Sequence, residues 1–353
     1  MHQLICRLAA LAAVAACSGN YADYYNPAVA HDGRDGFRNN YRAVAPSGFW
    51  KWQWERWTRG LPAPAPPGGW NFPVVHPDVE FLRGNHTETT VTWIGHATVL
   101  LQLDGKNILT DPHFGKRASP LSFAGPKRQT PVPLKLTELP HVDVVVISHN
   151  HYDHLDRGTV QKLARQPGGS PRFYVPLGLK PWFKGAGITD VVELDWWDSR
   201  AEGNLRIYCV PVQHWSKRGL FDRNQTLWGG WVIEARGAHP FRFFFAGDTG
   251  YSRDFRDIGG KFGGFDLAAL PIGAYAPRWF MSPQHIDPSE AVRIHRDLGA
   301  RRSIAVHWGT FVLSDEPLDE PPKKLREALK AAGIPGDQFL VLKHGETLRL
   351  AGQ

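Results

Sequence analysis

The stretch V-V-V-I-S-H-N-H-Y-D-H-L-D, residues 144–156, decides how this chain of 353 residues folds and where its chemistry lies. It opens with β-branched apolar residues that are typical of a buried strand. It then places His149, His151, Asp153 and His154 within six positions. Imidazole and carboxylate groups are ligands that Zn²⁺ accepts, and a bound divalent ion activates water near neutral pH. We therefore expect a metal site at the carboxyl end of a strand.

Three more candidate ligands follow short apolar runs farther along the chain. They are His214 in V-P-V-Q-H-W-S, Asp248 in F-F-F-A-G-D-T-G and His307 in S-I-A-V-H-W-G-T. Ligands at the ends of several strands can converge at one edge of a sheet. Seven ligands in total are too many for one tetrahedral ion, but they suit two ions that share a bridge. The first two histidines, at i and i+2, also exclude the helical H-E-x-x-H zinc motif.

Strand and helix patterns alternate from about residue 89 onward, which is typical of an α/β fold. Apolar runs predict strands at 90–94, 98–103, 107–110, 143–148, 173–175, 205–210, 230–234 and 241–246, and two more strands ending at residues 270 and 306. The clearest helix starts at D-P-S-E, residues 287–290, with an N-cap, Pro in the first turn and Glu at the capping-box position. Another helix is predicted over 322–332. A final hairpin is predicted to pair 339–343 with 347–350.

Composition and charge describe a globular protein with a moderate excess of basic residues. Hydrophobic residues make up 42% of the chain and charged residues 21%, as in ordinary folded domains. The formal net charge of +7 fits attraction to an anionic surface such as phospholipid headgroups. No basic run of the kind that tracks a phosphate backbone is present in the sequence, which argues against a nucleic-acid partner.

The first residues indicate export. An apolar segment at 8–16 follows Arg7 and is far too short to span a bilayer. It ends in V-A-A-C at Cys17, which resembles a bacterial lipoprotein cleavage box. Residues 1–16 are therefore expected to be a signal peptide and Cys17 the lipidated first residue, which would anchor the protein in the bacterial cell envelope, at the periplasmic face of the outer membrane. The alternative is an ordinary secretory peptide with Cys17 incidental. Only Cys209 would remain besides Cys17, so no disulfide framework is expected.

Residues 17–88 are expected to form an N-terminal extension. Its polar first part, to about residue 45, is predicted to be a tether. In the following F-W-K-W-Q-W-E-R-W segment, Trp50, Trp54 and Trp57 fall at helical spacing. One interpretation is a helix that packs these indoles on the main domain. The other is an interfacial segment at the level of lipid headgroups, where Trp and basic residues are favoured.

The complete ligand pattern resembles the metallo-β-lactamase superfamily: H-x-H-x-D-H, a distant His, a G-D-T Asp and a final His. Longer motifs narrow the resemblance to the phospholipase D family that hydrolyses N-acyl-phosphatidylethanolamine. These motifs are W-I-G-H-A-T-V-L from Trp93, T-D-P-x-F-x-x-R-A-S-P from Thr110, G-P-K-R from Gly125, Q-H-W-S-K-R from Gln213, P-I-G-A-Y-A-P-R-W-F-M from Pro271, Q-H-I-D-P-S-E-A-V-R-I-H from Gln284, H-W-G-T-F from His307 and V-L-K-H-G-E from Val341.

The resemblance implies a four-layer αβ/βα sandwich over residues 89–353, with a dinuclear metal site at one edge. It implies two Zn²⁺ per chain, although iron or manganese could replace zinc. One ion would be held by His149, His151 and His214. The other would be held by Asp153, His154 and His307, and Asp248 would bridge both.

The resemblance also implies a reaction, the hydrolysis of N-acyl-phosphatidylethanolamine to phosphatidic acid and N-acylethanolamine. A hydroxide held between the two ions would attack phosphorus in line, with Asp248 as the shared ligand and Asp153 beside it as the catalytic carboxylates. One alternative is another hydrolase of the same superfamily, such as a lactonase or a different phosphodiesterase. A second is an envelope lipoprotein that uses its metals structurally, but a complete ligand set argues against it.

The motifs also suggest residues around the metal ligands. Gln284 and His285 are expected to border the phospholipid headgroup, the alternative being that they cap the following helix. Four aromatic residues are candidate walls for the acyl chains, with core packing as the alternative for each: Trp215, Tyr251, Trp279 and Phe280. Asp111 and His96 are predicted to orient ligand imidazoles. The expected partners are the membrane phospholipid and the membrane surface, and a homodimer is one state open to the chain.

Overall fold

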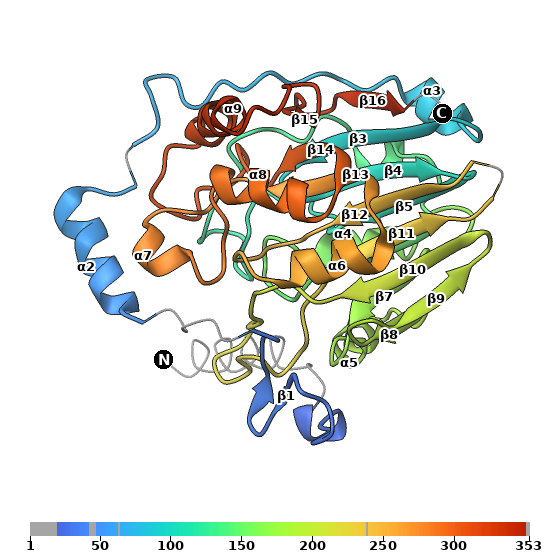
Figure 1. Ribbon diagram of the computed structural model, residues 1–353, viewed down its shortest axis with the longest axis horizontal. Coiled ribbons are helices and arrows are strands. Elements are labelled where there is room, and N and C mark those ends of the chain that lie inside the picture. Colours follow the sequence, from blue (N-terminus) through green and yellow to red (C-terminus); the bar gives the residue numbers. More distant parts are fainter. Residues whose placement is uncertain (1–19, 42–46, 63, 238, 351–353) are drawn as a thin grey trace.

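The computed structural model describes residues 20–41, 47–62, 64–237 and 239–350 (Figure 1). Two seven-stranded sheets pack face to face, and helices cover the outer face of each. This is the four-layer α/β sandwich that the sequence predicts. A helix long and apolar enough to cross a bilayer does not occur in these ranges.

The first sheet has the strand order β16-β3-β4-β5-β6-β7-β8. Its strands are β3 (Thr89–Gly95), β4 (Thr98–Leu103), β5 (Lys106–Thr110), β6 (Val144–Val146), β7 (Arg172–Pro176), β8 (Val191–Leu194) and β16 (Thr347–Leu350). Alternate residues of β6 face two different cores: Val144 and Val146 point between the sheets, and Val145 points to the outer helices. A strand covered on both faces carries a continuous apolar run, which explains the V-V-V-I sequence.

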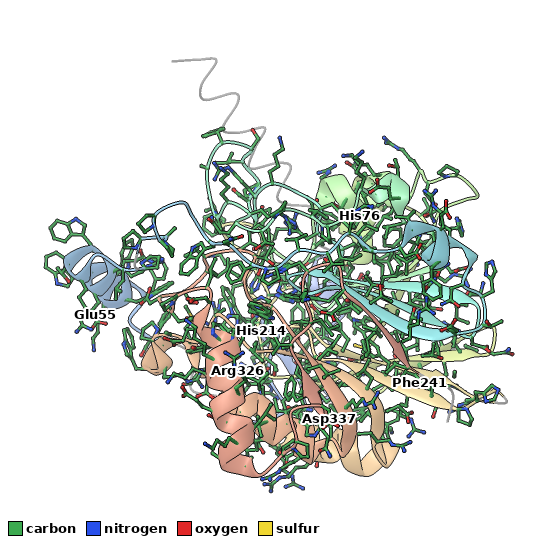
Figure 2. The ribbon with its side chains drawn as sticks, turned by 90° about the horizontal axis from the view of Figure 1, so that it is seen from above. Glu55, His76, His214, Phe241, Arg326 and Asp337 are labelled. Carbon is green, nitrogen blue, oxygen red and sulfur yellow. The ribbon has the colours of Figure 1, made fainter. Side chains whose placement is uncertain are left out.

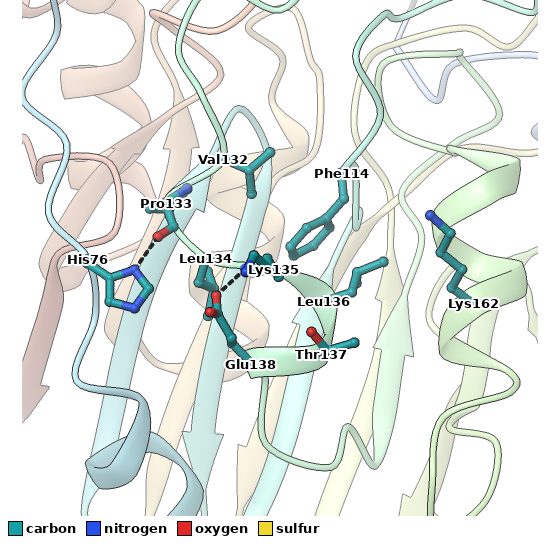
Figure 3. A pocket seen from close by; sticks show the side chains of 10 residues that line it. All are labelled: His76, Phe114, Val132, Pro133, Leu134, Lys135, Leu136, Thr137, Glu138 and Lys162. Carbon is teal, nitrogen blue, oxygen red and sulfur yellow. Dashed lines mark hydrogen bonds between the residues drawn. The ribbon is translucent and has the colours of Figure 1, made fainter.

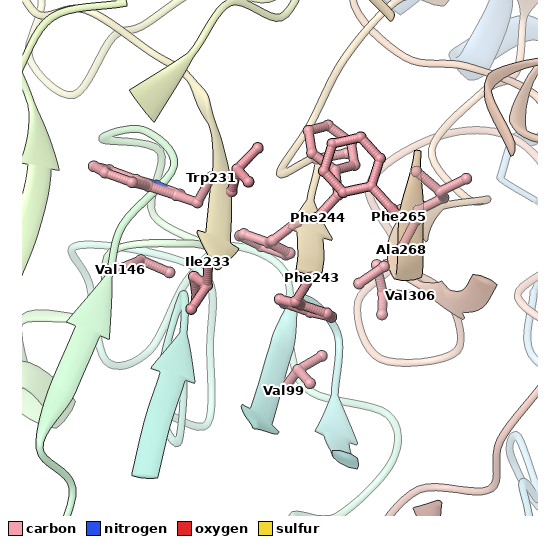
Figure 4. Close-up of a cluster of buried hydrophobic side chains, with 14 of the residues drawn as sticks. Val99, Val146, Trp231, Ile233, Phe243, Phe244, Phe265, Ala268 and Val306 are labelled. Atoms are coloured by element: carbon pink, nitrogen blue, oxygen red, sulfur yellow. The ribbon is translucent and has the colours of Figure 1, made fainter. Parts of the chain in front are cut away.

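The second sheet has the order β15-β14-β13-β12-β11-β10-β9. Its strands are β9 (Ser199–Glu202), β10 (Leu205–Val210), β11 (Gly230–Ala235), β12 (Phe241–Phe245), β13 (Phe265–Pro271), β14 (Ala300–Val306) and β15 (Phe339–Leu340). The main core lies between the sheets. In Figure 4, Val99 and Val146 of the first sheet share it with Ile233 and Phe243 of the second.

The helices are α2 (Phe49–Arg59), α3 (Val79–Gly84), α4 (Arg157–Leu163), α5 (Lys180–Gly185), α6 (Asp254–Phe262), α7 (Arg278–Met281), α8 (Pro288–Asp297) and α9 (Glu320–Ala332). The predicted capping box of α8 is present, since Asp287 accepts from the Glu290 amide at 2.9 Å and Glu290 accepts from the Asp287 amide at 3.1 Å. Helix α9 ends, as expected, at Gly333, whose positive φ suits the C-cap.

The predicted C-terminal hairpin is wrong. Strand β15 pairs in parallel with β14 in the second sheet, whereas β16 pairs antiparallel with β3 in the first. The chain therefore crosses from one sheet to the other between them. Two short strands separated by a Gly-containing turn give the same local sequence pattern whether they pair with each other or with different strands. The sequence pattern alone therefore does not distinguish a hairpin from this arrangement.

The N-terminal extension differs from its prediction at two places. Residues 20–41 are not a loose tether, because Tyr21 and Phe37 are buried in the main core and the Tyr24 hydroxyl donates to Glu193. Of the two interpretations of α2, the one that packs Trp50, Trp54 and Trp57 on the domain is wrong, because all three are exposed. Trp52, on the opposite face, packs there instead. Residues 1–19, with the predicted signal peptide and Cys17, lie outside the described residues.

Candidate metal centre

All seven predicted ligands lie at the carboxyl ends of strands on one edge of the sandwich. His149 follows β6, His214 follows β10, Asp248 follows β12 and His307 follows β14 directly. His214 is labelled in Figure 2, inside the body of the protein. The side chains of His151 and Asp153 extend from the turn after His149, and the structure brings all seven ligands together. Parallel and antiparallel strands thus deliver polar groups from distant parts of the chain to one buried place.

One group of three imidazoles is closely spaced. His151 Nδ1 lies 2.8 Å from His149 Nε2 and 3.3 Å from His214 Nε2. Two imidazole nitrogens on a tetrahedral zinc ion would be separated by about 3.3 Å, given zinc–nitrogen bonds of about 2.0–2.1 Å. The three residues match the set that the resemblance assigns to one ion.

A second group surrounds Asp153. Its Oδ2 atom lies 3.3 Å from His154 Nε2 and 3.4 Å from His307 Nε2. His96 Nε2 is also close, at 3.1 Å. These four residues can hold a metal ion between them. His96 was expected only to orient a ligand, and its sequence context carries no signal for this closer position.

Asp248 lies between the two groups. Its Oδ1 atom is 3.0 Å from His307 Nε2, and its Oδ2 atom is 3.1 Å from His154 Nε2 and 4.0 Å from His214 Nε2. Two carboxylate oxygens thus face both sets of nitrogens, which is the geometry that a bridging ligand needs.

The buried polar atoms fit a metal. His154 Nε2 and Asp248 Oδ1 have no hydrogen-bond partner among the described residues, despite their short distances to neighbouring charged atoms. Such atoms point at a common centre rather than at one another. A buried polar atom without a partner is costly, and an ion at that centre would satisfy several of them together.

Neighbouring groups orient the ligand imidazoles. His154 Nδ1 donates to Asp111 Oδ2 at 2.7 Å, and His214 Nδ1 donates to the Gln284 carbonyl at 2.9 Å. His149 Nδ1 contacts Ser148 Oγ at 2.9 Å. In each case the second nitrogen, Nε2, is left facing the centre, which is how outer partners usually fix metal-bound histidines. Asp111 therefore has the orienting position that the sequence predicts for it.

Asn39 holds the His214 segment from outside. Its amide donates to the His214 carbonyl at 3.0 Å and its oxygen accepts from the His214 backbone amide at 3.0 Å. Trp228 Nε1 donates to the same oxygen at 3.1 Å. Sequence reasoning missed Asn39, because the contact joins residues 175 positions apart and nothing local in the extension indicates it.

Three residues at the centre have positive φ angles, which non-glycine residues rarely adopt. They are His96 at 53°, Asp111 at 33° and His307 at 60°. Each stands where a strand ends and the chain turns. Such strain costs of order 1–3 kcal/mol per residue and clusters at functional sites. Here it aims the three side chains into the edge of the sandwich.

Burial and neighbouring charge set the protonation of the ligands. Burial lowers the pKa of His149 and His214 well below the ordinary value, and lowers the pKa of His151 to about 4. Burial raises the pKa of Asp248, but the imidazoles of His154 and His307 outweigh it and hold that pKa well below its usual range. The imidazoles of His149, His151 and His214 are therefore neutral and the carboxylate of Asp248 is anionic. These are the protonation states that bind metal.

The residues predicted to contact substrate divide into two sets. His285 Nδ1 lies 3.8 Å from Asp248 Oδ2, and the Trp215 ring lies 4.5 Å from the His151 ring. Gln284 is buried beside them, and its side-chain oxygen has no hydrogen-bond partner among the described residues. These three line the centre.

The other three residues, which are predicted as walls for the acyl chains, contact neighbouring helices rather than metal ligands. The Tyr251 hydroxyl donates to Asp297 of α8 and its ring carries the Arg293 guanidinium at 3.9 Å. Phe280 stacks on Trp52 of α2, and Trp279 lies under the Lys51 ammonium at 4.7 Å. Phe280 is buried, as the packing alternative expects, whereas Trp279 is 42% exposed, and the role of these residues as walls for the acyl chains stays a prediction.

A separate cavity of about 750 Å³ lies away from the metal ligands (Figure 3). Its lining includes His76, Phe114, Lys135 and Lys162, and His76 Nδ1 is bonded to the Pro133 carbonyl at 2.7 Å. None of its lining residues belongs to a group that could hold an ion. Within the described residues, the cavity therefore carries no candidate metal site.

The sequence of this chain is similar to those of known metal-dependent hydrolases. A model of the β-lactamase superfamily domain matches residues 106–308. An N-acyl-phosphatidylethanolamine-hydrolysing phospholipase D from Caenorhabditis elegans is 45% identical over 275 residues, covering 74% of this chain and 76% of that protein. The mitochondrial protein of that description from Saccharomyces cerevisiae is 41% identical over 262 residues, covering 72% of this chain and 55% of its own length.

Solved structures show the same fold at low sequence identity. An isothiocyanate hydrolase from Delia radicum gut bacteria matches with a TM-score of 0.59 and 21% identity, covering 75% of this chain and 100% of that one. A metallo-hydrolase from Ignicoccus hospitalis matches with a TM-score of 0.58 and 21% identity, covering 76% and 100%. This chain is therefore an enzyme of the metallo-β-lactamase superfamily and belongs, within it, to the family of N-acyl-phosphatidylethanolamine-hydrolysing phospholipases D.

Proposed function

We propose that this protein is a zinc-dependent phospholipase D that hydrolyses N-acyl-phosphatidylethanolamine to phosphatidic acid and N-acylethanolamine. One observation carries the proposal: Asp248 stands between two ligand groups in a chain that is 45% identical to a relative named for this reaction. In this proposal the two groups hold two Zn²⁺ ions. Two ions so placed would supply a nucleophilic water and offset the charge that develops on phosphoryl oxygens.

The chain's own residues prepare this chemistry. Asp153 and Asp248 are buried carboxylates that stay ionised, because the surrounding imidazoles outweigh the effect of burial on the pKa of each. His285 stands beside Asp248 and is positioned to hydrogen-bond a phosphodiester oxygen. Burial lowers its pKa to about 4, so at neutral pH the ring is uncharged and can donate from one nitrogen. The Trp215 ring packs edge-on against the His151 ring, with centroids 4.5 Å apart, and forms part of the wall beside the site.

The proposed substrate is a membrane phospholipid, and we propose that the enzyme is anchored to the membrane. The lipobox-like sequence that ends at Cys17 would anchor the protein to the bacterial cell envelope. An anchor at the periplasmic face of the outer membrane would give the enzyme lasting access to a phospholipid that never leaves the bilayer. Mass spectrometry of the N-terminal peptide tests this part, and an unmodified Cys17 in the mature protein would contradict it.

A substrate panel tests the reaction. Purified protein would receive N-acyl-phosphatidylethanolamine, ordinary phosphatidylethanolamine, a lactone and a generic phosphodiester, with products identified by mass. We expect phosphatidic acid and N-acylethanolamine from the first substrate and about two equivalents of zinc per chain, one for each of the two ligand groups between which Asp248 lies. Hydrolysis of the lactone or the generic phosphodiester without the N-acylated lipid would overturn the proposal, as would recovery of clearly less than two metal ions per chain.

A further inference from the structure

The segment between α7 and α8 carries His285, whose ring lies beside the carboxylate of Asp248. Outer partners fix the ligand imidazoles of His149, His154 and His214 through their Nδ1 atoms. The ring of His285 has no such partner within the part of the chain that the structure describes. Its Nδ1 atom lies 3.8 Å from Asp248 Oδ2, which is beyond hydrogen-bond distance. The direction of this ring therefore depends on how the backbone of residue 285 is held.

Three consecutive carbonyl groups, at 283–285, each accept a hydrogen bond from a side chain. Gln213 Nε2 donates to the first at 2.9 Å, and His214 Nδ1 donates to the second at 2.9 Å. Arg278 Nη1 donates to the third at 2.7 Å. The first two donors belong to the segment of the metal ligand His214, whereas Arg278 comes from α7. Arg278 therefore holds the backbone of His285 from a different element than the one that carries the ligand.

The stretch of chain that Arg278 spans is fixed at both ends. Before α7, the buried carboxylate of Glu316 accepts from the backbone amides of Ala274 at 2.6 Å and Ala276 at 2.9 Å. After His285, the amide of Ile286 donates to the carbonyl of Thr249 at 2.8 Å. Thr249 directly follows the ligand Asp248 in the sequence. Arg278 thus projects from a defined place and acts on the last free carbonyl before the chain is bound again.

The guanidinium of Arg278 is itself held by two carboxylates. Its Nη2 atom donates to Glu290 Oε2 at 2.7 Å, and its Nε atom lies 3.5 Å from Asp287 Oδ2. Both carboxylates belong to the capping box of α8. A guanidinium presents its donors in a rigid, planar fork. With two nitrogens facing these carboxylates, the third is aimed at the carbonyl of His285.

The alternative is that Arg278 only ties α7 to α8. The side chains of Arg278, Asp287 and Glu290 are 33%, 30% and 30% exposed, and ion pairs with that much solvent around them contribute little to stability. Helix α8 also has its own start signals, the capping box and a Pro in its first turn. Loss of Arg278 should therefore leave the fold intact and change chiefly the position of His285.

We propose that Arg278 is a positioning residue, which holds the carbonyl of His285 and thereby directs the His285 ring at an oxygen of the phosphate group bound at the metal centre. The proposal rests on the proposed function in one respect, namely that the bound group is a phosphodiester. A displacement of about 1 Å at a group that acts on substrate costs about 10²-fold in rate. One carbonyl contact on a segment that is otherwise fixed is therefore enough to affect turnover.

Binding of inorganic phosphate tests the positioning without turnover. Zinc-loaded, full-length protein would be titrated with inorganic phosphate by calorimetry. Arg278→Gln should bind phosphate about tenfold more weakly, the loss expected when one hydrogen bond to a charged group is misaligned. Arg256→Gln is the matched control, because Arg256 pairs with a carboxylate of α8, Asp297, at 3.2 Å but does not contact the segment at 283–285. It should bind phosphate like the parent.

A double-mutant cycle separates positioning from a general loosening of the site. In the parent, Arg278→Gln should lower both the phosphate affinity and the kcat for N-acyl-phosphatidylethanolamine about tenfold. In the His285→Ala background, the same exchange should change each by less than about twofold, because the residue through which Arg278 acts is already absent. Circular dichroism and zinc content of every variant should match those of the parent.

Three results would overturn the proposal. The first is phosphate binding by Arg278→Gln equal to that of the parent. The second is an equal loss in both backgrounds, which would show that Arg278 acts on something other than His285. The third is a loss of zinc from Arg278→Gln, which would assign its effect to the ligand His214. A parent that does not hydrolyse N-acyl-phosphatidylethanolamine, but keeps the expected cycle in phosphate binding, would refute the proposed reaction and support the role of Arg278.

Discussion

The metal centre and the outer face of helix α2 reverse the usual distribution of side chains in opposite ways. At the centre, His154 and Asp248 are at most 2% exposed although they are charged or polar. On the outer face of α2, Trp50 is 81% exposed although it is aromatic. Buried polar groups persist where an ion can satisfy them, and exposed aromatic groups persist where another apolar phase can cover them. Each region is unfavourable in water alone, and each indicates a missing partner.

Removal of metal should have the largest effect and tests the first half of this comparison. A chelator should abolish turnover and lower the melting temperature, because ions that bind only the native state stabilise it by mass action. Without them, Asp153 and Asp248 remain buried among imidazoles. Added Zn²⁺ should restore both properties. Full activity after metal content has fallen below detection would refute a catalytic metal centre.

The exchange Asp248→Asn should reduce turnover by about 10²-fold or more while the fold persists, because the amide has the same shape but loses the charge that two cations share. Activity and circular dichroism of the variant would be compared with those of the parent. The exchange Asp254→Asn provides a control, since Asp254 is also buried but bonds Ser252 and Asn40 rather than a ligand. Equal losses in both variants would contradict the bridging position of Asp248.

Asn39→Ala should weaken metal binding about tenfold, a loss typical of outer partners that orient a ligand. The reason is that the two bonds to the His214 backbone are lost. Zinc affinity by competition with a chromophoric chelator gives the readout. Asn40→Ala is the matched control, because Asn40 donates to Asp254 at 3.0 Å and not to a ligand segment. Zinc affinity of Asn39→Ala equal to that of Asn40→Ala would show that the N-terminal segment does not position His214.

His344 is a buried imidazole that belongs to neither ligand group, and its substitution should have the smallest effect of those considered. Burial, with a contribution from Arg128, lowers its pKa from 6.5 to about 3. As the pH falls, His344 is therefore protonated in the unfolded chain before it is protonated in the folded protein. The contribution of the neutral ring to the free energy of unfolding is thus fully present above pH 6.5 and is lost as the pH falls toward 3. His344→Gln should flatten the fall of unfolding free energy with acid. Identical slopes in the parent and in His344→Gln would contradict the prediction.

The fold and the ligand set were largely predictable because their signals are local. The run at 144–148 and the phenylalanines of β12 identify strands buried on both faces. Each ligand follows its own strand within a few residues, so the convergence of seven groups follows from the sheet edge. The last two strands were predicted but their pairing was not predictable, and the sequence left open whether the indoles of α2 face the domain or the solvent. Each depends on which neighbour a short apolar segment meets, and several neighbours satisfy the same pattern.

The sequence by itself determined the ligand types, their order and the α/β framework, because periodicity and strand ends are properties of contiguous residues. Only the tertiary structure decided that Asn39 clamps His214, that His96 joins the group around Asp153, and that Phe280 packs on Trp52. It also decided that Trp50, Trp54 and Trp57 stay exposed while Trp52 is buried. These contacts join residues far apart in the chain, and their free energies arise from close packing and burial that no short segment contains.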